Sequence, residues 1–154
     1  MINATDSKGT FYILNKKDRT PIIFIHGVGL DHSIWDPQIN EFDNTVLIYD
    51  ILGHGKTPLN KNDLSFDDFS DQIINLMDEL KFNKVHLVGF SIGSLIARNF
   101  ATRFNNRLAS LTLLCSIFNR SDKEQKIVND RFEQTKKIIN LLKMLLKGGL
   151  QKIF

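Results

Sequence analysis

The sequence predicts an α/β protein built on a doubly wound, mostly parallel sheet. Short, continuous apolar runs alternate with longer stretches of helical periodicity. Apolar runs without polar alternation are typical of strands buried on both faces. Strand, helix and strand at these intervals favour crossover connections within one sheet. The four runs are Ile22–Ile25, Val46–Tyr49, Val85–Gly89 and Leu108–Leu114.

The segments around these runs complete the predicted order of elements. Thr10–Leu14 precedes Pro21 and predicts an antiparallel edge strand, and a first helix is expected to begin near His32. A second helix follows two acidic residues that suit the positive end of a helix dipole, and Asn83 is expected to end it in a left-handed conformation. Its apolar positions are Phe69, Ile73, Leu76 and Leu80. A third helix is expected over Ser91–Phe104.

Composition excludes several classes of protein. The chain has 154 residues, 42% hydrophobic and 24% charged, which is typical of one ordinary globular domain. No window reaches the roughly 18 apolar residues of a membrane span, and the N-terminus lacks the pattern of a signal peptide. Cys115 is the only cysteine, so no internal disulfide can form and a cytoplasmic location is expected.

The net charge of +3 is unevenly distributed. Residues 119–154 hold nine basic and four acidic side chains, whereas residues 1–118 hold eleven basic and thirteen acidic ones. The positive charge therefore belongs to the C-terminal segment, whose aromatic residues, Phe132 and Phe154, do not form the interleaved pattern of a surface that stacks on nucleic acid. We expect no nucleic-acid partner.

The pentapeptide Gly89-Phe90-Ser91-Ile92-Gly93 lies directly between a predicted strand and a predicted helix. Glycines at its ends allow a sharp turn that exposes Ser91 as a nucleophile at the sheet edge. The helix N-terminus beside it offers free N–H groups to a developing oxyanion. The alternative interpretation is a glycine-rich turn in which Ser91 only caps the helix.

Two further segments follow the other strands. His26-Gly27-Val28-Gly29 comes after the first buried run, where the N–H of Val28, together with that of Ile92, would form an oxyanion hole. A glycine-rich turn, Asp50–Thr57, comes after the second run.

These three segments resemble the α/β-hydrolase superfamily over Thr10–Leu114. The closest resemblance is to the branch of small esterases, enol-lactonases and carbon–carbon bond hydrolases, in which a Trp such as Trp35 follows the His-Gly loop. The resemblance implies a serine hydrolase that acts on a small-molecule ester, lactone or related carbonyl through an acyl-enzyme. In that family His26 orders the loop, Gly27, Gly29, Gly89 and Gly93 shape the loop and elbow, and no cofactor is used.

The sequence departs from the family pattern after Ser91. The family order is nucleophile, acid, histidine, yet His26, His32, His54 and His86 all precede Ser91. No triad acid or triad histidine is identified, and the last two family strands are absent. We expect His26 and His54 to be weak alternatives as a base, His32 to be exposed beside a cap, and His86 to point into packing. The four histidines lack ligand spacing, so no metal site is expected.

The sequence therefore predicts two parts, an N-terminal part of a hydrolase core over 1–118 and the start of a helical cap over 119–154. Apolar residues and lysines alternate along two expected cap helices, the second ended by Gly148-Gly149. A helix lying on an anionic membrane is the weaker alternative, and no stable membrane insertion is expected. The apolar residues of the stripe are Ile127, Val128, Phe132, Ile138, Ile139, Leu142, Leu145 and Leu146.

Three hypotheses follow for function. The chain is an incomplete serine hydrolase that is inactive alone, one half of a split hydrolase completed by a C-terminal half, or a non-catalytic small-molecule-binding protein. Without two later strands, Leu108–Leu114 becomes an exposed sheet edge, so the isolated chain is expected to be marginally stable or prone to aggregate. The apolar faces of the cap helices are expected to drive self-association.

Overall fold

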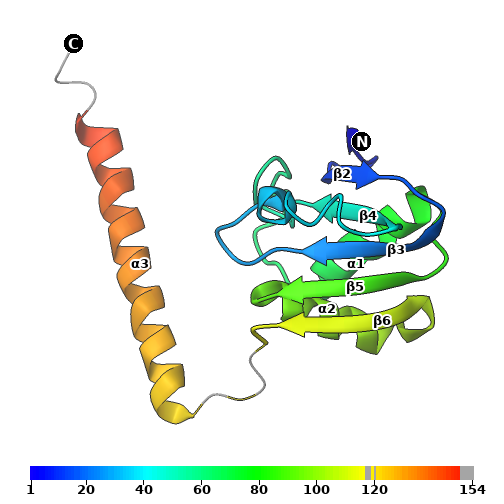
Figure 1. Cartoon of the computed structure of the whole chain (residues 1–154). Helices are drawn as coiled ribbons and strands as arrows, with labels where there is room; N and C mark the ends of the chain where they lie inside the picture. The colour runs from blue at the N-terminus through cyan, green and yellow to red at the C-terminus, as the bar shows by residue number, and fades with distance from the viewer. Residues whose placement is uncertain (117–118, 120, 150–154) are drawn as a thin grey trace. The chain divides into compact units, whose positions relative to one another are not determined.

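The computed structural model describes residues 1–116, 119 and 121–149. The chain separates into two compact units, 1–116 and 117–154, and each is described by itself. In the first unit six strands form one sheet in the order β1-β2-β4-β3-β5-β6 (Figure 1). The last four strands of the chain are parallel to one another, and the sheet is antiparallel only where β2 pairs with β4 and with β1, which confirms the predicted α/β class. The strands are β1 (Ile2–Thr5), β2 (Phe11–Asn15), β3 (Arg19–Ile25), β4 (Asn44–Tyr49), β5 (Val85–Phe90) and β6 (Leu108–Leu114).

Strand β2 is antiparallel, as predicted, but the prediction that it forms the sheet edge is wrong. Strand β1 pairs with it on the outer side, with Ile2 opposite Leu14 and Thr5 opposite Phe11. Strand β1 has only four residues, and three of them are exposed. So short and exposed a strand carries no clear hydrophobic pattern, which explains why the sequence did not predict it.

Helix α1 (Phe66–Glu79) begins at a capping box in which the side chains of Ser65 and Asp68 each accept the other residue's backbone N–H. Its left-handed terminating residue is Lys81, with φ 59°, and the prediction of Asn83 is wrong. The N–H of Lys81 donates to Asp78 O and that of Phe82 to Met77 O, the pair of bonds that closes a Schellman motif. These bonds fix the end of the helix two residues earlier than expected.

Helices α1 and α2 (Ile92–Arg103) lie on the same face of the sheet (Figure 1) and enclose the main core. On the opposite face the described residues form η1 (His32–Trp35), so the helix expected near His32 does begin there but is a single 3₁₀ turn. Pro37 has no N–H with which to continue the helix, which explains its single turn. Trp35 still packs on the sheet, with its ring 4.9 Å from that of Phe24.

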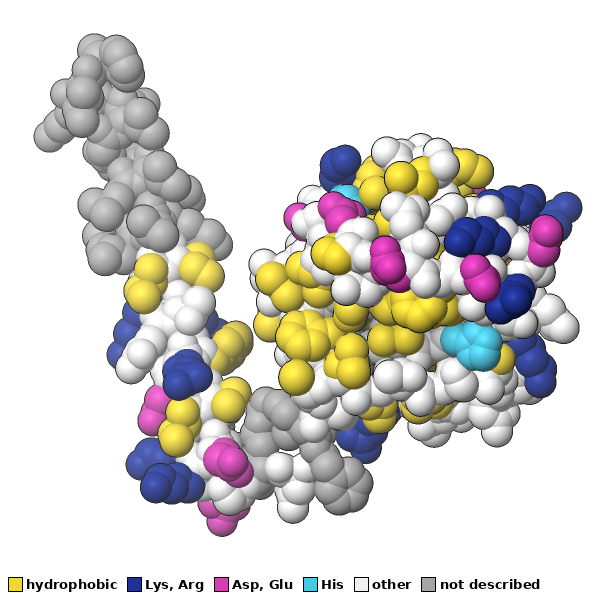
Figure 2. Space-filling model, viewed as in Figure 1, with side chains coloured by type: hydrophobic (Ala, Val, Ile, Leu, Met, Phe, Trp, Pro, Cys, Tyr) yellow, Lys and Arg dark blue, Asp and Glu magenta, His cyan; other side chains and the backbone are white. Residues whose placement is uncertain are grey.

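Strand β6 lies at the edge of the sheet, as predicted, and six of its seven residues are exposed. Beside it, part of the face opposite α1 and α2 is open as a groove of about 440 Å³. Figure 2 shows hydrophobic side chains gathered on this face. The groove is lined by Ile22, Phe24, Phe42, Asn44, His86, Val88, Ser110 and Thr112.

The second unit contains α3 (Asp122–Gly149), one continuous helix of 28 residues rather than the two expected. Neither glycine nor proline interrupts the sequence between Asp122 and Lys147, and Gly148-Gly149 falls in the last turn. Phe118, where the predicted boundary falls, and the side chains of Leu142, Leu145 and Leu146 lie outside the described residues. Among the described helices, none is both long and apolar enough to cross a membrane.

Candidate active site

The carboxyl ends of β3, β4 and β5 meet at the point where the strand order reverses. The chain passes from β3 to β4 on one side and then to β5 on the other side of β3. Ligands of open α/β sheets bind in the crevice at such a switch point. His26 follows β3, Asp50 follows β4 and Ser91 follows β5, so all three predicted segments come to this edge.

Ser91 has a strained backbone, with φ 56° and ψ −118°. A residue with a side chain rarely adopts this region, and such strain clusters at functional sites. Ser91 stands at the N-cap position of α2, yet its side chain makes no capping hydrogen bond. Capping alone therefore does not account for a serine here. The turn is instead held by backbone bonds, from Ser91 N to Leu114 O at 3.0 Å and from Ser94 N to Ser91 O at 3.0 Å.

The two glycines of the pentapeptide are required by close backbone approaches. A Cβ on Gly89 would lie 2.2 Å from Gly93 O, and a Cβ on Gly93 would lie 2.5 Å from Ile25 O. Real Cβ atoms do not approach backbone oxygens so closely. The first turn of α2 therefore sits directly on the ends of β5 and β3. This places the N–H groups of the helix beside the loop that follows β3.

The loop from His26 to Leu30 packs against the serine turn. A Cβ on Gly27 would lie 3.2 Å from the ring of Phe90, the residue that precedes Ser91. Leu30 N donates to Gly27 O at 3.3 Å and Gly29 has φ 73°, so the loop turns tightly. Val28 at its tip is 66% exposed. Among the described residues, no acceptor is found for the N–H of Val28 or of Ile92.

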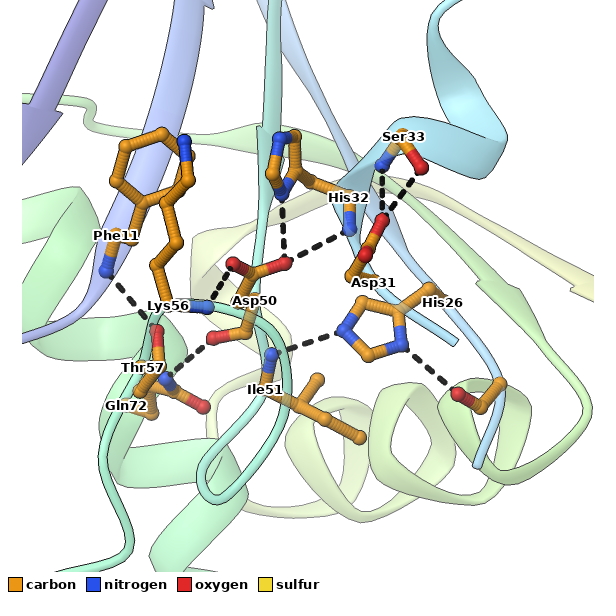
Figure 3. Close-up of polar contacts among 11 residues, drawn as sticks. Phe11, His26, Asp31, His32, Ser33, Asp50, Ile51, Lys56, Thr57 and Gln72 are labelled. Atoms are coloured by element: carbon orange, nitrogen blue, oxygen red, sulfur yellow. Dashed lines mark hydrogen bonds and ion pairs between the residues drawn. The ribbon is translucent and has the colours of Figure 1, made fainter. Parts of the chain in front are cut away.

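His26 is fully buried beneath this loop, and both of its ring nitrogens are engaged. Nδ1 lies 2.8 Å from Gly27 O, and Nε2 accepts the N–H of Ile51 at 3.1 Å (Figure 3). These partners define the neutral tautomer with the proton on Nδ1. Burial lowers the pKa of His26, and the nearby His54 lowers it further. With Nε2 occupied by Ile51, His26 has no nitrogen free to accept a proton from Ser91.

The buried carboxylate of Asp50 joins the loops that follow β3 and β4 (Figure 3). One oxygen accepts from His32 N and lies 2.8 Å from His32 Nδ1, and the other accepts from Lys56 N at 2.8 Å. A Cβ on Gly55 would lie 2.3 Å from this carboxylate, so the close packing requires glycine. The Asp50 carbonyl accepts from Gln72 of α1 at 3.0 Å. The sequence pattern identified the turn Asp50–Thr57 but assigned no role to Asp50. The signal that could have found it is an Asp that directly follows a buried strand and precedes a Gly-x-Gly turn.

The other histidines are placed differently from the expectation. His32 is half-buried rather than exposed, and its ring lies 4.9 Å from that of Phe11 in β2. In the sheet, β3 lies between β4 and β5. Asp50 follows β4 and Ser91 follows β5, so the two residues follow strands that lie about 10 Å apart. His86 lines the open groove, with Nδ1 2.8 Å from Ser110 Oγ, so the expectation that it points into packing is wrong. His54 is half-buried, with Nδ1 3.1 Å from Leu52 O.

Three potential metal-ligating groups do lie together, although no metal site was expected. Ligand atoms of Asp31, His32 and Asp50 are within 4.8 Å of one another. Hydrogen bonds already occupy them, since Asp31 accepts from the side chain and backbone N–H of Ser33. The same two hydrogen bonds, the side-chain bond first, lower the pKa of Asp31. The cluster is therefore accounted for as a hydrogen-bonded network that ties η1 to β4.

The fold and the strained serine define a class, an α/β protein that presents a serine at the carboxyl edge of a parallel sheet beside a His-Gly loop. The chain belongs to the alpha/beta hydrolase fold family, whose model matches residues 20–140. It is 29% identical over 129 residues to the (E)-2-((N-methylformamido)methylene)succinate hydrolase of Acinetobacter baylyi, covering 82% of this chain and 49% of that protein. It is also 29% identical over 100 residues to 3-oxoadipate enol-lactonase 1 of the same organism, covering 63% and 37%.

Solved structures give the same result. The meta-cleavage product hydrolase of Pseudomonas fluorescens superposes with a TM-score of 0.66 at 31% identity, covering 73% of this chain and 43% of that one. An α/β hydrolase from a deep-sea metagenome library, at 19% identity and a TM-score of 0.76, covers 88% and 51% and supports the fold alone. The chain spans about half, or less, of the length of these relatives.

Proposed function

We propose that Ser91 is the nucleophile of a hydrolase that cleaves an ester, lactone or related carbonyl compound. The observation that carries this proposal is the strained backbone of Ser91, whose side chain does not cap the helix that it precedes. Ser91 Oγ would attack the carbonyl carbon while its proton passes to a base, and collapse of the tetrahedral intermediate would expel the alcohol or enol. Water would then release the acid from the acyl-enzyme.

The oxyanion of that intermediate would be bound by the N–H groups of Val28 and Ile92. Both are backbone donors with no acceptor among the described residues, and they belong to two segments in contact through Gly27, Phe90 and Gly93. Fixed donors aimed at developing charge supply a large part of the rate of acyl transfer. His26 would act as a positioning residue, since it anchors the Val28 loop to Ile51 at the end of β4.

The relatives support a small carbonyl substrate. Their names describe hydrolysis of a methylenesuccinate derivative, an enol-lactone and a meta-cleavage product. All of these are small molecules, so we propose a small-molecule substrate for this site as well.

None of the four histidines in the 154 residues has the position, after Ser91, from which the family's histidine takes the serine proton. All four histidines precede Ser91 in the sequence, and His26 and His32 are engaged with Ile51 and Asp50. We propose that polypeptide beyond these residues supplies the acid and the histidine, from the same chain or from a second one, and that the 154 residues alone are inactive. The same shortage favours a second candidate, a protein that binds a small carbonyl compound without turning it over.

Labelling with a fluorophosphonate probe tests the proposal. The 154-residue chain should show no labelling above that of Ser91→Ala. Fusion to the C-terminal part of a related hydrolase should restore labelling that Ser91→Ala removes and that Ser110→Ala, at an exposed serine, leaves intact. A folded fusion without Ser91-dependent labelling would favour the binding protein.

The coding sequence beyond the Phe154 codon supplies a second test. An open frame that encodes a late Asp and a Gly-His pair would support the hydrolase. An unrelated gene there would support the binding protein or a separate complementing chain.

A further inference from the structure

A basic pocket lies at the amino edge of the sheet, at the opposite ends of the strands from Ser91. Two segments form it, residues 16–21, which are the turn after β2 and the start of β3, and residues 80–84, which connect α1 to β5; Thr45 of β4 also lines it. The concavity measures about 540 Å³. Figure 2 shows Lys and Arg side chains gathered along the side on which, in Figure 1, strands β3 and β5 begin. The two segments are nearly 60 residues apart in the sequence, so only the fold joins them.

The positive charge of this pocket exceeds what its surroundings would provide by chance. Residues 1–116 hold eleven basic side chains against thirteen acidic ones. Five of the eleven line this one pocket, together with a single acid, Asp18. A unit of net charge −2 therefore carries a concentrated positive site. The five are Lys16, Lys17, Arg19, Lys81 and Lys84.

Three of these cations have neither an ion pair nor a side-chain hydrogen bond among the described residues. Arg19 pairs with Asp43 at 3.4 Å, and Lys17 Nζ donates to the carbonyl of Phe42. The ammonium groups of Lys16, Lys81 and Lys84 make no ion pair or hydrogen bond among the described residues. Three basic residues elsewhere in the unit are instead paired with acids at short range, through Lys61–Asp68, Arg103–Asp71 and Arg107–Asp78, each at 2.8 Å.

The backbone that carries these cations is fixed. Lys17 N donates to Thr45 Oγ1 at 2.9 Å, and the same hydroxyl donates back to Lys17 O. Lys81 occupies the left-handed position of the Schellman motif that closes α1. The negative end of the α1 dipole faces this turn, but it amounts to about half an elementary charge against three unpaired ammonium groups. The lining residues therefore keep a net positive charge, with five basic side chains against Asp18.

We propose that this pocket binds an oligophosphate, either inorganic or carried by a nucleotide. Lysine ammonium groups act as point charges and lack the flat fork by which arginine grips a single carboxylate. Three such charges, on two anchored turns that line one pocket, suit a compact ligand that carries three or four negative charges along a short chain. The site lies apart from Ser91, so binding there does not depend on the hydrolase proposal.

Isothermal titration of the 154-residue chain with sodium tripolyphosphate tests the proposal. We expect a Kd below about 1 mM in about 20 mM NaCl, weakened at least tenfold in about 300 mM NaCl by screening. The variant Lys16→Gln/Lys81→Asn/Lys84→Gln should bind at least tenfold more weakly. Asn is chosen at position 81 because it tolerates positive φ, and circular dichroism confirms that each variant is folded.

The matched control Lys123→Gln/Lys126→Gln/Lys137→Gln removes the same net charge from α3. It should change the affinity less than twofold. Equal weakening by the two triple variants, or no heat of binding at millimolar tripolyphosphate in low salt, would overturn the proposal. A second titration with ATP distinguishes the sources: tighter binding of ATP assigns the site to a nucleotide, and equal or weaker binding assigns it to the inorganic chain.

Discussion

The Nε2 atom of His26 lies 3.1 Å from the backbone nitrogen of Ile51, joining the residue after β3 to the residue that follows Asp50 at the end of β4. This bond anchors the loop that carries Val28 to the end of β4, and Gly27 in the same loop packs against Phe90. The geometry of the proposed oxyanion hole therefore depends on a buried, neutral imidazole.

The stability of the protein should depend on pH through His26. Because burial lowers its pKa in the folded state, the unfolded chain takes up a proton below about pH 6.5 that the folded chain does not. The free energy of unfolding should therefore fall as pH drops from about 7.5 to 5, by at most about 1.4 kcal/mol per pH unit from this group. Urea unfolding at several pH values measures it.

Two variants isolate that contribution. His26→Gln keeps an acceptor for the Ile51 N–H and should flatten the pH dependence over this range. His26→Ala should in addition lose about 1–3 kcal/mol, since it leaves that buried N–H unpaired. His86→Gln, on the open groove, serves as the control and should leave the fall in place. A wild-type curve that is flat between pH 7.5 and 5 would contradict the assigned role of His26.

Ser91→Gly should stabilise the fold. At φ 56° and ψ −118° a serine backbone is strained, and releasing such strain is worth about 1–3 kcal/mol, partly offset by the greater freedom of glycine in the unfolded chain. Thermal unfolding should show a higher Tm for Ser91→Gly than for Ser91→Ala, which retains a Cβ. Equal Tm values would show that the Ser91 conformation stores no strain.

Adding a methyl group at Gly89 should destabilise the protein much more than at Gly29. The Cβ of Gly89→Ala would lie 2.2 Å from Gly93 O, whereas that of Gly29→Ala meets nothing within 4 Å and is affected only by φ 73°. We expect about 3 kcal/mol or more for the first and about 1–2 kcal/mol for the second. Chemical denaturation compares them, and similar losses would mean that α2 can shift away from β5.

The exposed edge at β6 should make the 154-residue chain associate. The strand holds no charge and no proline, the residues by which natural edges avoid pairing. Leu113 on β6 is 36% exposed, and Ile138 on α3 is 58% exposed. Substituting each residue distinguishes association through the sheet edge from association through the helix. Leu113→Lys should raise the monomer fraction in sedimentation velocity, whereas Ile138→Lys should leave it unchanged. The reverse result would assign association to the helix.

The sequence predicted the elements that have strong local patterns. Strands β3, β4 and β5, the helices behind them and the serine turn are visible as apolar runs and glycine spacing, because burial within a parallel sheet leaves a continuous signal. Strand β6 has the same kind of apolar run, although six of its seven residues are exposed. Strand β1 was missed because it is short and exposed. The helix expected near His32 is a single 3₁₀ turn, since Pro37 has no N–H with which to continue it.

The order of residues by itself determined the family resemblance, the position of Ser91 between strand and helix, and the lack of any histidine after it. Only the tertiary structure decided that Ser91 is strained and does not cap α2, that Asp50 binds both His32 and Lys56, and that Lys16, Lys81 and Lys84 share one pocket. Local periodicity specifies elements one at a time. Contacts between turns far apart in the chain depend on how the strands are ordered in the sheet, and that order is set by packing.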